Sequence, residues 1–292
     1  MFVKAFEEAI QFTRPIHTIV RYWEGEQPEP GTSSLFFVND EGWALTCKHV
    51  ANVLGSSGKI NETYEQFKIA RDSSKGSRSR SGIVELGRKF GYKRGTVIEI
   101  YNRVINCVEG KLTIDLKLHP SVDLALLKFK NYDKLLCNKF PRFAKDSGIL
   151  KPGKFICRLG FPFPEFTNFE HDEAGDKMQW TTAGKEDTPC FPIEGMLTRH
   201  LGKQGDIVGF ELSTPGLKGQ SGGPAFDSDG LIIGMQCATN HLDLQFDLNK
   251  DVFRSGRKVH VLERTFLHVG HCVHLDVMKA FMNEHGVKFS EG

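Results

Sequence analysis

The sequence predicts an all-β protein made of two packed units. Apolar runs typical of strands recur along the chain and are bounded by turn residues, for example at residues 31–38, 43–50, 124–127 and 231–236. Turns rich in glycine, proline and aspartate separate these runs. A chain of 292 residues exceeds the usual size of one hydrophobic core. We therefore expect two units, each with its own β-core.

Composition and charge exclude several classes of protein. The chain is 39% hydrophobic and 25% charged, which is ordinary for a soluble protein, and its net charge of +2 indicates no particular partner. No apolar run approaches membrane-spanning length, so no membrane contact is expected. Residues 1–13 lack the apolar core of a secretory signal and instead predict a short amphipathic helix.

The cysteines favour a reducing compartment. Seven is an odd number, and they lie singly along the chain, several of them inside apolar runs. We predict free, buried thiols and a cytoplasmic location. These residues are Cys47, Cys107, Cys137, Cys157, Cys190, Cys237 and Cys272.

The segment Gly-Gln-Ser-Gly-Gly-Pro at residues 219–224 holds the first candidate catalytic residue. Three glycines and a proline within six residues require a tight turn with close backbone approach. Ser221, at the centre of that turn, is a candidate nucleophile. The alternative is an ordinary surface turn.

A nucleophilic serine needs a base, and the base needs an orienting acid. His49 stands at the exit of the predicted strand 43–50, and Asp123 directly precedes the apolar run 124–127. Asp115 is a rival acid, but it falls in the middle of the predicted strand 112–118, where its direction and depth are less suitable.

Four segments carry a resemblance to a known family: Phe-Phe-Val-Asn-x-x-Gly-x-x-Leu-Thr-x-x-His at 36–49, Asp-Leu-Ala-Leu-Leu-Lys at 123–128, the stretch 153–163, and residues 219–224 with the strand after them. With the order His, Asp, Ser, the sequence resembles the trypsin-like serine proteases, and within them the HtrA-like branch. The resemblance covers residues 31–237, with a fainter continuation over 270–279. HtrA-like relatives are often secreted and often carry C-terminal PDZ domains, and we find no counterpart of either feature.

The resemblance implies a fold and its division. We expect two six-stranded antiparallel β-barrels with the catalytic cleft between them, and a short helix at each end. The expected units are an N-terminal helix at 1–14, barrels at 15–135 and 136–273, and a C-terminal helix and tail at 274–292. Asp276 is expected to cap the last helix, which Gly286 ends.

The resemblance also implies peptide-bond hydrolysis through an acyl-enzyme, without a cofactor. Ser221 would attack, His49 would act as base and then as acid, and Asp123 would orient the imidazole. The backbone N–H groups of Gly219 and Ser221 would form the oxyanion hole.

The same resemblance assigns a substrate pocket. Pro215 would form its floor, where no carboxylate stands to pair with a basic side chain. Cleavage is therefore expected after small or medium uncharged residues. Segment 239–257, expected to be a loop beside the groove, carries three aspartates that could supply the missing charge (Asp243, Asp247 and Asp251). The expected substrate-binding residues are Pro215, Leu217, Gln236, Cys237 and Ala238.

Two alternatives use other parts of the chain. Residues 71–94 are rich in Arg and Lys and predict a flexible basic loop, which could bind nucleic acid or an acidic partner but is more often simply solvated. The barrels could also form a catalytically idle scaffold that binds peptides. No metal site is expected, because neither His171-Asp172-Glu173 nor the triplet His268, His271 and His274 has suitable placement.

Overall fold

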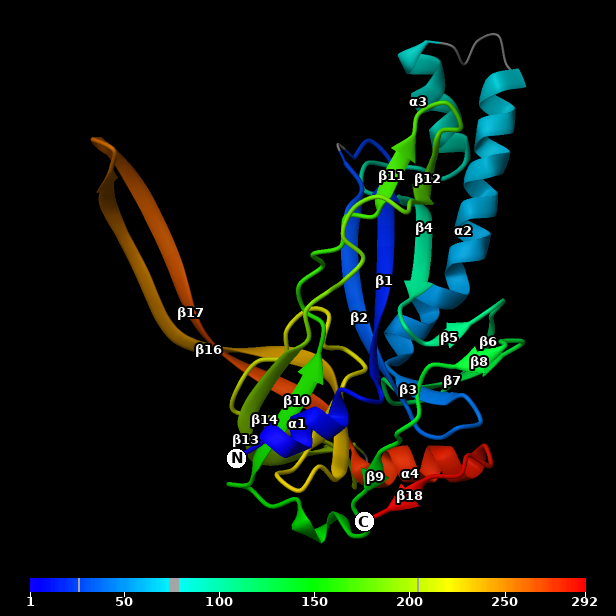
Figure 1. Ribbon diagram of the computed structural model, residues 1–292. Coiled ribbons are helices and arrows are strands. Elements are labelled where there is room, and N and C mark those ends of the chain that lie inside the picture. The colour runs from blue at the N-terminus through cyan, green and yellow to red at the C-terminus, as the bar shows by residue number, and fades with distance from the viewer. Residues whose placement is uncertain (26, 74–78, 204) are drawn as a thin grey trace.

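The computed structural model describes residues 1–25, 27–73, 79–203 and 205–292, and it contains two large β-sheets joined by one continuous core. The first sheet has six strands in the order β4-β1-β2-β3-β7-β6 (Figure 1). All neighbouring strands of this sheet pair in antiparallel orientation. The strands are β1 (Thr13–Tyr22), β2 (Glu29–Phe37), β3 (Trp43–Thr46), β4 (Val97–Val104), β6 (Thr113–Leu118) and β7 (Ala125–Lys130).

The second sheet contains a closed ring of six strands. The order β15-β10-β13-β14-β17-β16 returns to its start through the pairing of β15 with β16. Two short strands, β9 (Arg142–Phe143) and β18 (Ser290–Glu291), extend the sheet beside β16. Ring strands are β10 (Phe155–Gly160), β13 (Phe191–Lys203), β14 (Asp206–Leu212), β15 (Pro224–Phe226), β16 (Ile232–Arg254) and β17 (Arg257–His274). The expected two-barrel β-fold is confirmed.

The two terminal helices are also present. Helix α1 (Val3–Ala9) buries Ala5 and Ala9, and α4 (Leu275–Glu284) buries four apolar side chains in the common core. The cap of α4 differs from the expectation. His274 is the N-cap, and its Nδ1 accepts the N–H of Asp276 at 3.3 Å. Asp276 therefore lies inside the first turn, where its carboxylate interacts favourably with the positive end of the helix dipole.

The expected flexible basic loop is wrong for the residues that the structure describes. Residues 48–73 form the long helix α2 (Lys48–Ser73), and α3 (Arg80–Lys89) follows. The basic residues Lys75 and Arg78 lie outside the described residues. Tyr64 and Phe67 of α2 pack with Trp23 and Tyr92 into a separate aromatic core, which holds the helix pair against the first sheet.

The segment at residues 163–190, called the insertion below, contacts helix α2. It forms a hairpin of β11 (Phe169–Asp172) and β12 (Lys177–Trp180), and Asp176 lies in its turn. The Asp176 carboxylate accepts hydrogen bonds from Arg21 at 2.8 Å, Arg71 at 2.6 Å and the Tyr64 hydroxyl at 3.0 Å. One carboxylate thus joins the hairpin to β1 and α2.

The expected loop at 239–257 is also wrong. Strands β16 and β17 continue as a paired hairpin to Arg254 and Arg257, and this arm projects from the body (Figure 1). Asp243, Asp247 and Asp251 lie exposed along the arm rather than inside the pocket that the sequence led us to expect for the substrate.

The remaining short elements complete the description. Strand β5 (Val108–Glu109) pairs with β8 (Lys134–Leu135), and a 3-10 turn, η2, covers Ser147–Ile149. Among the residues described here, no helix combines the length and apolar character needed to cross a membrane. All seven cysteines are free thiols; five are buried as predicted, whereas Cys190 and Cys237 are only partly buried.

Candidate active site

The pairing of β3 with β7 brings His49 and Asp123 together. Thr46 at the end of β3 is the register partner of Ala125 at the start of β7. The chain leaves β3 and enters α2 directly, which places His49 in the first turn of that helix. Asp123 precedes β7 at the same edge of the sheet. The sequence placed His49 correctly at a strand exit, although the strand ends earlier than expected.

Asp123 binds His49 at two points. Its Oδ1 accepts the backbone N–H of His49 at 2.9 Å, and its Oδ2 lies 2.7 Å from the ring Nδ1. Partial burial alone would raise the pKa of Asp123, but the hydrogen bonds from His49 outweigh that effect and lower it. The carboxylate therefore stays ionised, and Nε2 is the ring nitrogen that remains for another partner.

The glycines around Ser221 are required by close packing. A Cβ on Gly222, whose φ is 87°, would lie 2.1 Å from the Ser34 carbonyl oxygen, and a Cβ on Gly223 would lie 1.8 Å from that of Leu159. Ser34 also donates its N–H to the Ser221 carbonyl at 2.9 Å. The turn that carries Ser221 is thus clamped between the two sheets.

Gly219 has the backbone conformation that only glycine adopts easily. Its φ is 102°, and a Cβ there would lie 2.5 Å from the Phe161 carbonyl oxygen. The Ser34 hydroxyl donates to the Gly219 carbonyl at 2.8 Å, which fixes the peptide plane after it. Within the described chain, the N–H groups of Gly219 and Ser221 donate to no protein acceptor.

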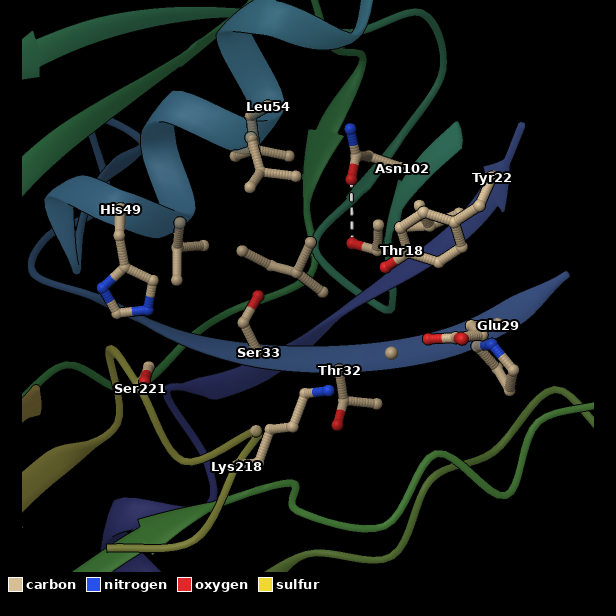
Figure 2. Close-up of a pocket in the computed structure, with 17 residues that line it drawn as sticks. Thr18, Tyr22, Glu29, Thr32, Ser33, His49, Leu54, Asn102, Lys218 and Ser221 are labelled. Carbon is tan, nitrogen blue, oxygen red and sulfur yellow. Dashed lines mark hydrogen bonds between the residues drawn. The ribbon is translucent and has the colours of Figure 1, made fainter. Parts of the chain in front are cut away.

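His49 and Ser221 line one pocket at the junction of the two sheets (Figure 2). The cavity has a volume of about 290 Å³, and its far walls come from β1, β2 and the first turns of α2. The Lys218 side chain points toward Thr32 at this pocket (Figure 2). Apolar side chains, including Val53 and Leu54, form much of the lining.

A second pocket of about 500 Å³ opens on the other side of Ser221. Four of the five expected substrate-binding residues line it: Pro215, Leu217, Gln236 and Ala238. The fifth, Cys237, is directed elsewhere, and its thiol donates to the His271 carbonyl at 3.2 Å. A bulge in β16 between Gln236 and Ala238 accompanies this change of direction.

The rival residues do not join the site. Asp115 forms an ion pair with Lys130 on an exposed strand face. Cys47 lies close: its sulfur, a His49 nitrogen and an Asp123 oxygen fall within 4.8 Å of one another, a donor set that could hold a metal. Each donor is already engaged, however, because Cys47 donates to the Gln236 carbonyl and burial raises the pKa of this thiol well above its ordinary value.

The side chains of the histidine groups considered from the sequence contact different partners. His171 contacts Arg21 at 2.7 Å, while Asp172 accepts turn amides of its own hairpin. Within the other group, His268 bonds to His241, whereas His271 lies 3.5 Å from Glu211. His274 caps α4.

Sequence reasoning missed two features of the second pocket. One is Arg158, a fully buried arginine of β10 whose guanidinium bonds to Gln236. The other is the pair His241 and His268, which lines the outer rim. A single charged residue inside the apolar strand 155–160 was the signal for the first. The second has no local signal, because it depends on the register of β16 and β17.

Residues 32–235 match the family model described as a trypsin-like peptidase domain. This match spans well over half of the chain, so the protein belongs to the trypsin-like peptidase family. Among solved structures, an HtrA-type protease, AlgW, with a tripeptide, matches at 16% identity with a TM-score of 0.46. That match covers 98% of this chain but only 65% of the neighbour. A search of curated proteins gave no match.

Proposed function

We propose that the protein is a serine endopeptidase in which Ser221, His49 and Asp123 form the catalytic triad. The observation that carries this proposal is the double contact of Asp123 with His49, at the pocket that also exposes Ser221. Membership of the trypsin-like peptidase family supports the same reaction class.

In the proposed reaction, the Ser221 hydroxyl attacks the scissile carbonyl while His49 Nε2 accepts its proton. Asp123 holds Nδ1 as a donor and stabilises the imidazolium that forms. The N–H groups of Gly219 and Ser221 bind the oxyanion. His49 then donates the proton to the leaving amine, and water repeats the sequence on the acyl-enzyme.

The second pocket is the proposed site for the side chain that precedes the cut. Among the described residues that line it there is no carboxylate, which disfavours arginine and lysine there. The sequence-based preference for small or medium uncharged residues rests on the same point, and it stays a prediction.

A fluorophosphonate probe tests the reaction class without knowledge of the substrate. We expect one covalent adduct, mapped to Ser221 and abolished in Ser221→Ala. The matched control is Ser228→Ala, which changes an exposed serine in the turn between β15 and β16. A folded protein that shows no adduct would instead support the idle scaffold.

A further inference from the structure

A buried cation, the guanidinium of Arg158, contacts Gln236, which lines the second pocket. Arg158 extends from β10, and the residue is completely buried. Its Nη1 donates to Gln236 Oε1 at 2.7 Å, and its Nη2 donates to the Thr214 hydroxyl at 2.5 Å and to the Thr214 carbonyl at 3.1 Å. A Cβ on Gly270 would lie 2.1 Å from Nη1, so glycine at this position leaves space for the guanidinium.

This cation has no anionic partner in the described part of the chain. Its hydrogen-bond acceptors are neutral oxygens, and its Nε has no acceptor at all. Removing an arginine from water without a counter-charge is energetically costly. Burial accordingly lowers the pKa of Arg158 from its ordinary value. Such a group is stabilised by an anion that enters beside it.

Gln236 lies between the guanidinium and the pocket, and its amide is oriented. The Oε1 end accepts from Arg158, while the Nε2 end donates to the Ala238 carbonyl at 2.6 Å. Nε2 also lies 2.0 Å from the place where a Cβ on Gly216 would stand, and both Gly216 and Gln236 line the pocket. The donor end of the amide therefore lies beside a lining residue, and the cation polarises it in the direction that favours an anion.

Among the described residues that line the pocket, Lys218 is the cation. The pair His241 and His268 lines it as well, and their Nδ1 atoms lie 2.5 Å apart, so one ring donates to the other. The nearest acid along the arm is Asp243, two register pairs further out on the same face as His241, and it is not among the lining residues.

We propose that this pocket selects a glutamate or aspartate as the residue before the cut, with Gln236 contacting the carboxylate and Arg158 supplying its counter-charge through that amide. The proposal rests on the proposed peptidase function and narrows its substrate class. The proposal retains the expectation that arginine and lysine are disfavoured before the cut. It replaces the expected preference for small or medium uncharged residues at that position.

The test uses internally quenched peptides that are identical except for the residue before the cut, which is Glu, Asp, Gln, Val or Arg. Glutamate and glutamine have the same shape, so their ratio of kcat/KM isolates the charge. We expect Glu over Gln by roughly 10- to 100-fold, because the site's cation is left unpaired by the amide.

Arg158→Met should reduce the Glu-to-Gln ratio toward one, and Arg158→Lys should retain part of it. Lys218→Met is the matched rim variant, and we expect a smaller loss from it because its ammonium group is exposed. Fluorophosphonate labelling of Ser221 and the melting temperature show that each variant is folded and has a reactive serine. If Arg158→Met does not fold, the wild-type ratio and Gln236→Leu carry the same test.

Wild-type enzyme that reacts with the probe in one sample and, unlabelled, cleaves after Val and Gln as well as after Glu would overturn the specificity proposal while leaving the peptidase function intact. A ratio unchanged in folded Arg158→Met would do the same. Absence of both labelling and cleavage would instead refute the proposed function, so the two failures are distinguishable.

Discussion

Asp123 contacts His49 through both carboxylate oxygens, one on the backbone N–H at 2.9 Å and one on the ring Nδ1 at 2.7 Å. Because His49 lies in the first turn of α2, the first contact satisfies an N–H that the helix leaves unpaired. The second sets the orientation of the imidazole. One carboxylate therefore serves both the start of the helix and the proposed base.

Substitution can separate these two contacts. Asp123→Asn keeps an oxygen for the backbone N–H but presents an amide donor to the ring, which favours the wrong tautomer. We expect kcat to fall about 10⁴-fold with little change in melting temperature. Asp123→Ala should also lower the free energy of unfolding by about 1 kcal/mol, because the cap is lost. Asp115→Asn is the control, and a comparable loss of activity there would contradict the assignment.

The glycines of the turn that carries Ser221 provide a second prediction. Gly222→Ala combines an unfavourable φ with a Cβ 2.1 Å from the Ser34 carbonyl oxygen. Gly91 is a matched control, since its φ is 80° but no atom lies within 4 Å of the position that a Cβ would take there. We expect Gly91→Ala to destabilise the protein by roughly 1–2 kcal/mol and Gly222→Ala by clearly more, with loss of probe labelling. Equal denaturation midpoints would show that packing at the turn is unimportant.

Asp176 provides a test of how the insertion at 163–190 is held. Burial would raise the pKa of its carboxyl, but hydrogen bonds from Arg21 and Arg71 lower it to about 2. A lowered carboxyl pKa stabilises the fold above the ordinary value near 4, and this contribution is lost as pH falls through 2. We expect Asp176→Asn to lose about 2 kcal/mol at pH 7.

Chemical denaturation of Asp176→Asn between pH 7 and 2 measures this contribution. The difference from wild type should shrink as the pH falls below 4. Glu173→Gln, at an exposed acid of the same hairpin, should behave as wild type at every pH. A pH-independent difference for Asp176→Asn would show that shape, rather than charge, holds the hairpin.

Buried His17 predicts a dependence on pH in a milder range. It stacks on Phe166 with ring centroids 4.1 Å apart and bonds to the Thr188 hydroxyl at 2.8 Å. Burial first, and then the nearby Arg103 cation, lower its pKa to about 4. Between pH 6.5 and 4 the unfolded chain binds the additional proton, so stability should fall as the pH falls through this window.

We expect His17→Gln to remove a slope of at most ~1.4 kcal/mol per pH unit from the unfolding free energy. Denaturant titrations at pH 7, 6 and 5 measure that slope. His285→Gln, in the C-terminal region, controls for histidine titration in general. Parallel stability curves for wild type and His17→Gln would refute a neutral, buried His17.

The β-fold was predicted from local strand and turn patterns, whereas the contact of His49 with Asp123, 74 residues apart, was expected from the resemblance to a known family. Gly222 and Gly223 are glycines because any Cβ there would collide with the neighbouring sheet, so close packing is visible in the chain itself. The catalytic roles of His49, Asp123 and Ser221, by contrast, stay predictions that the experiments above address.

The two large errors have a common physical cause. Helix α3 begins with Arg-Ser-Gly at 80–82, a composition typical of a flexible loop, and the helix pair depends on tertiary packing of Tyr64 and Phe67 of α2. The arm of β16 and β17 carries both charge signs on its strands, which resembles a solvated loop. In each case partners distant in sequence determine the structure, so local propensity was an unreliable guide.

The uninterrupted course of β16 and β17 has a consequence for motion. Near Gln236 and Cys272 these strands belong to the barrel, but beyond His241 and His268 no third strand pairs with them in the described chain. An isolated hairpin is only marginally stable in water, so its amide hydrogens should exchange much faster than those of the barrel. The rim of the second pocket lies at this boundary. We therefore expect transient opening of the arm to reach the pocket through the same two strands and to change the width of the pocket.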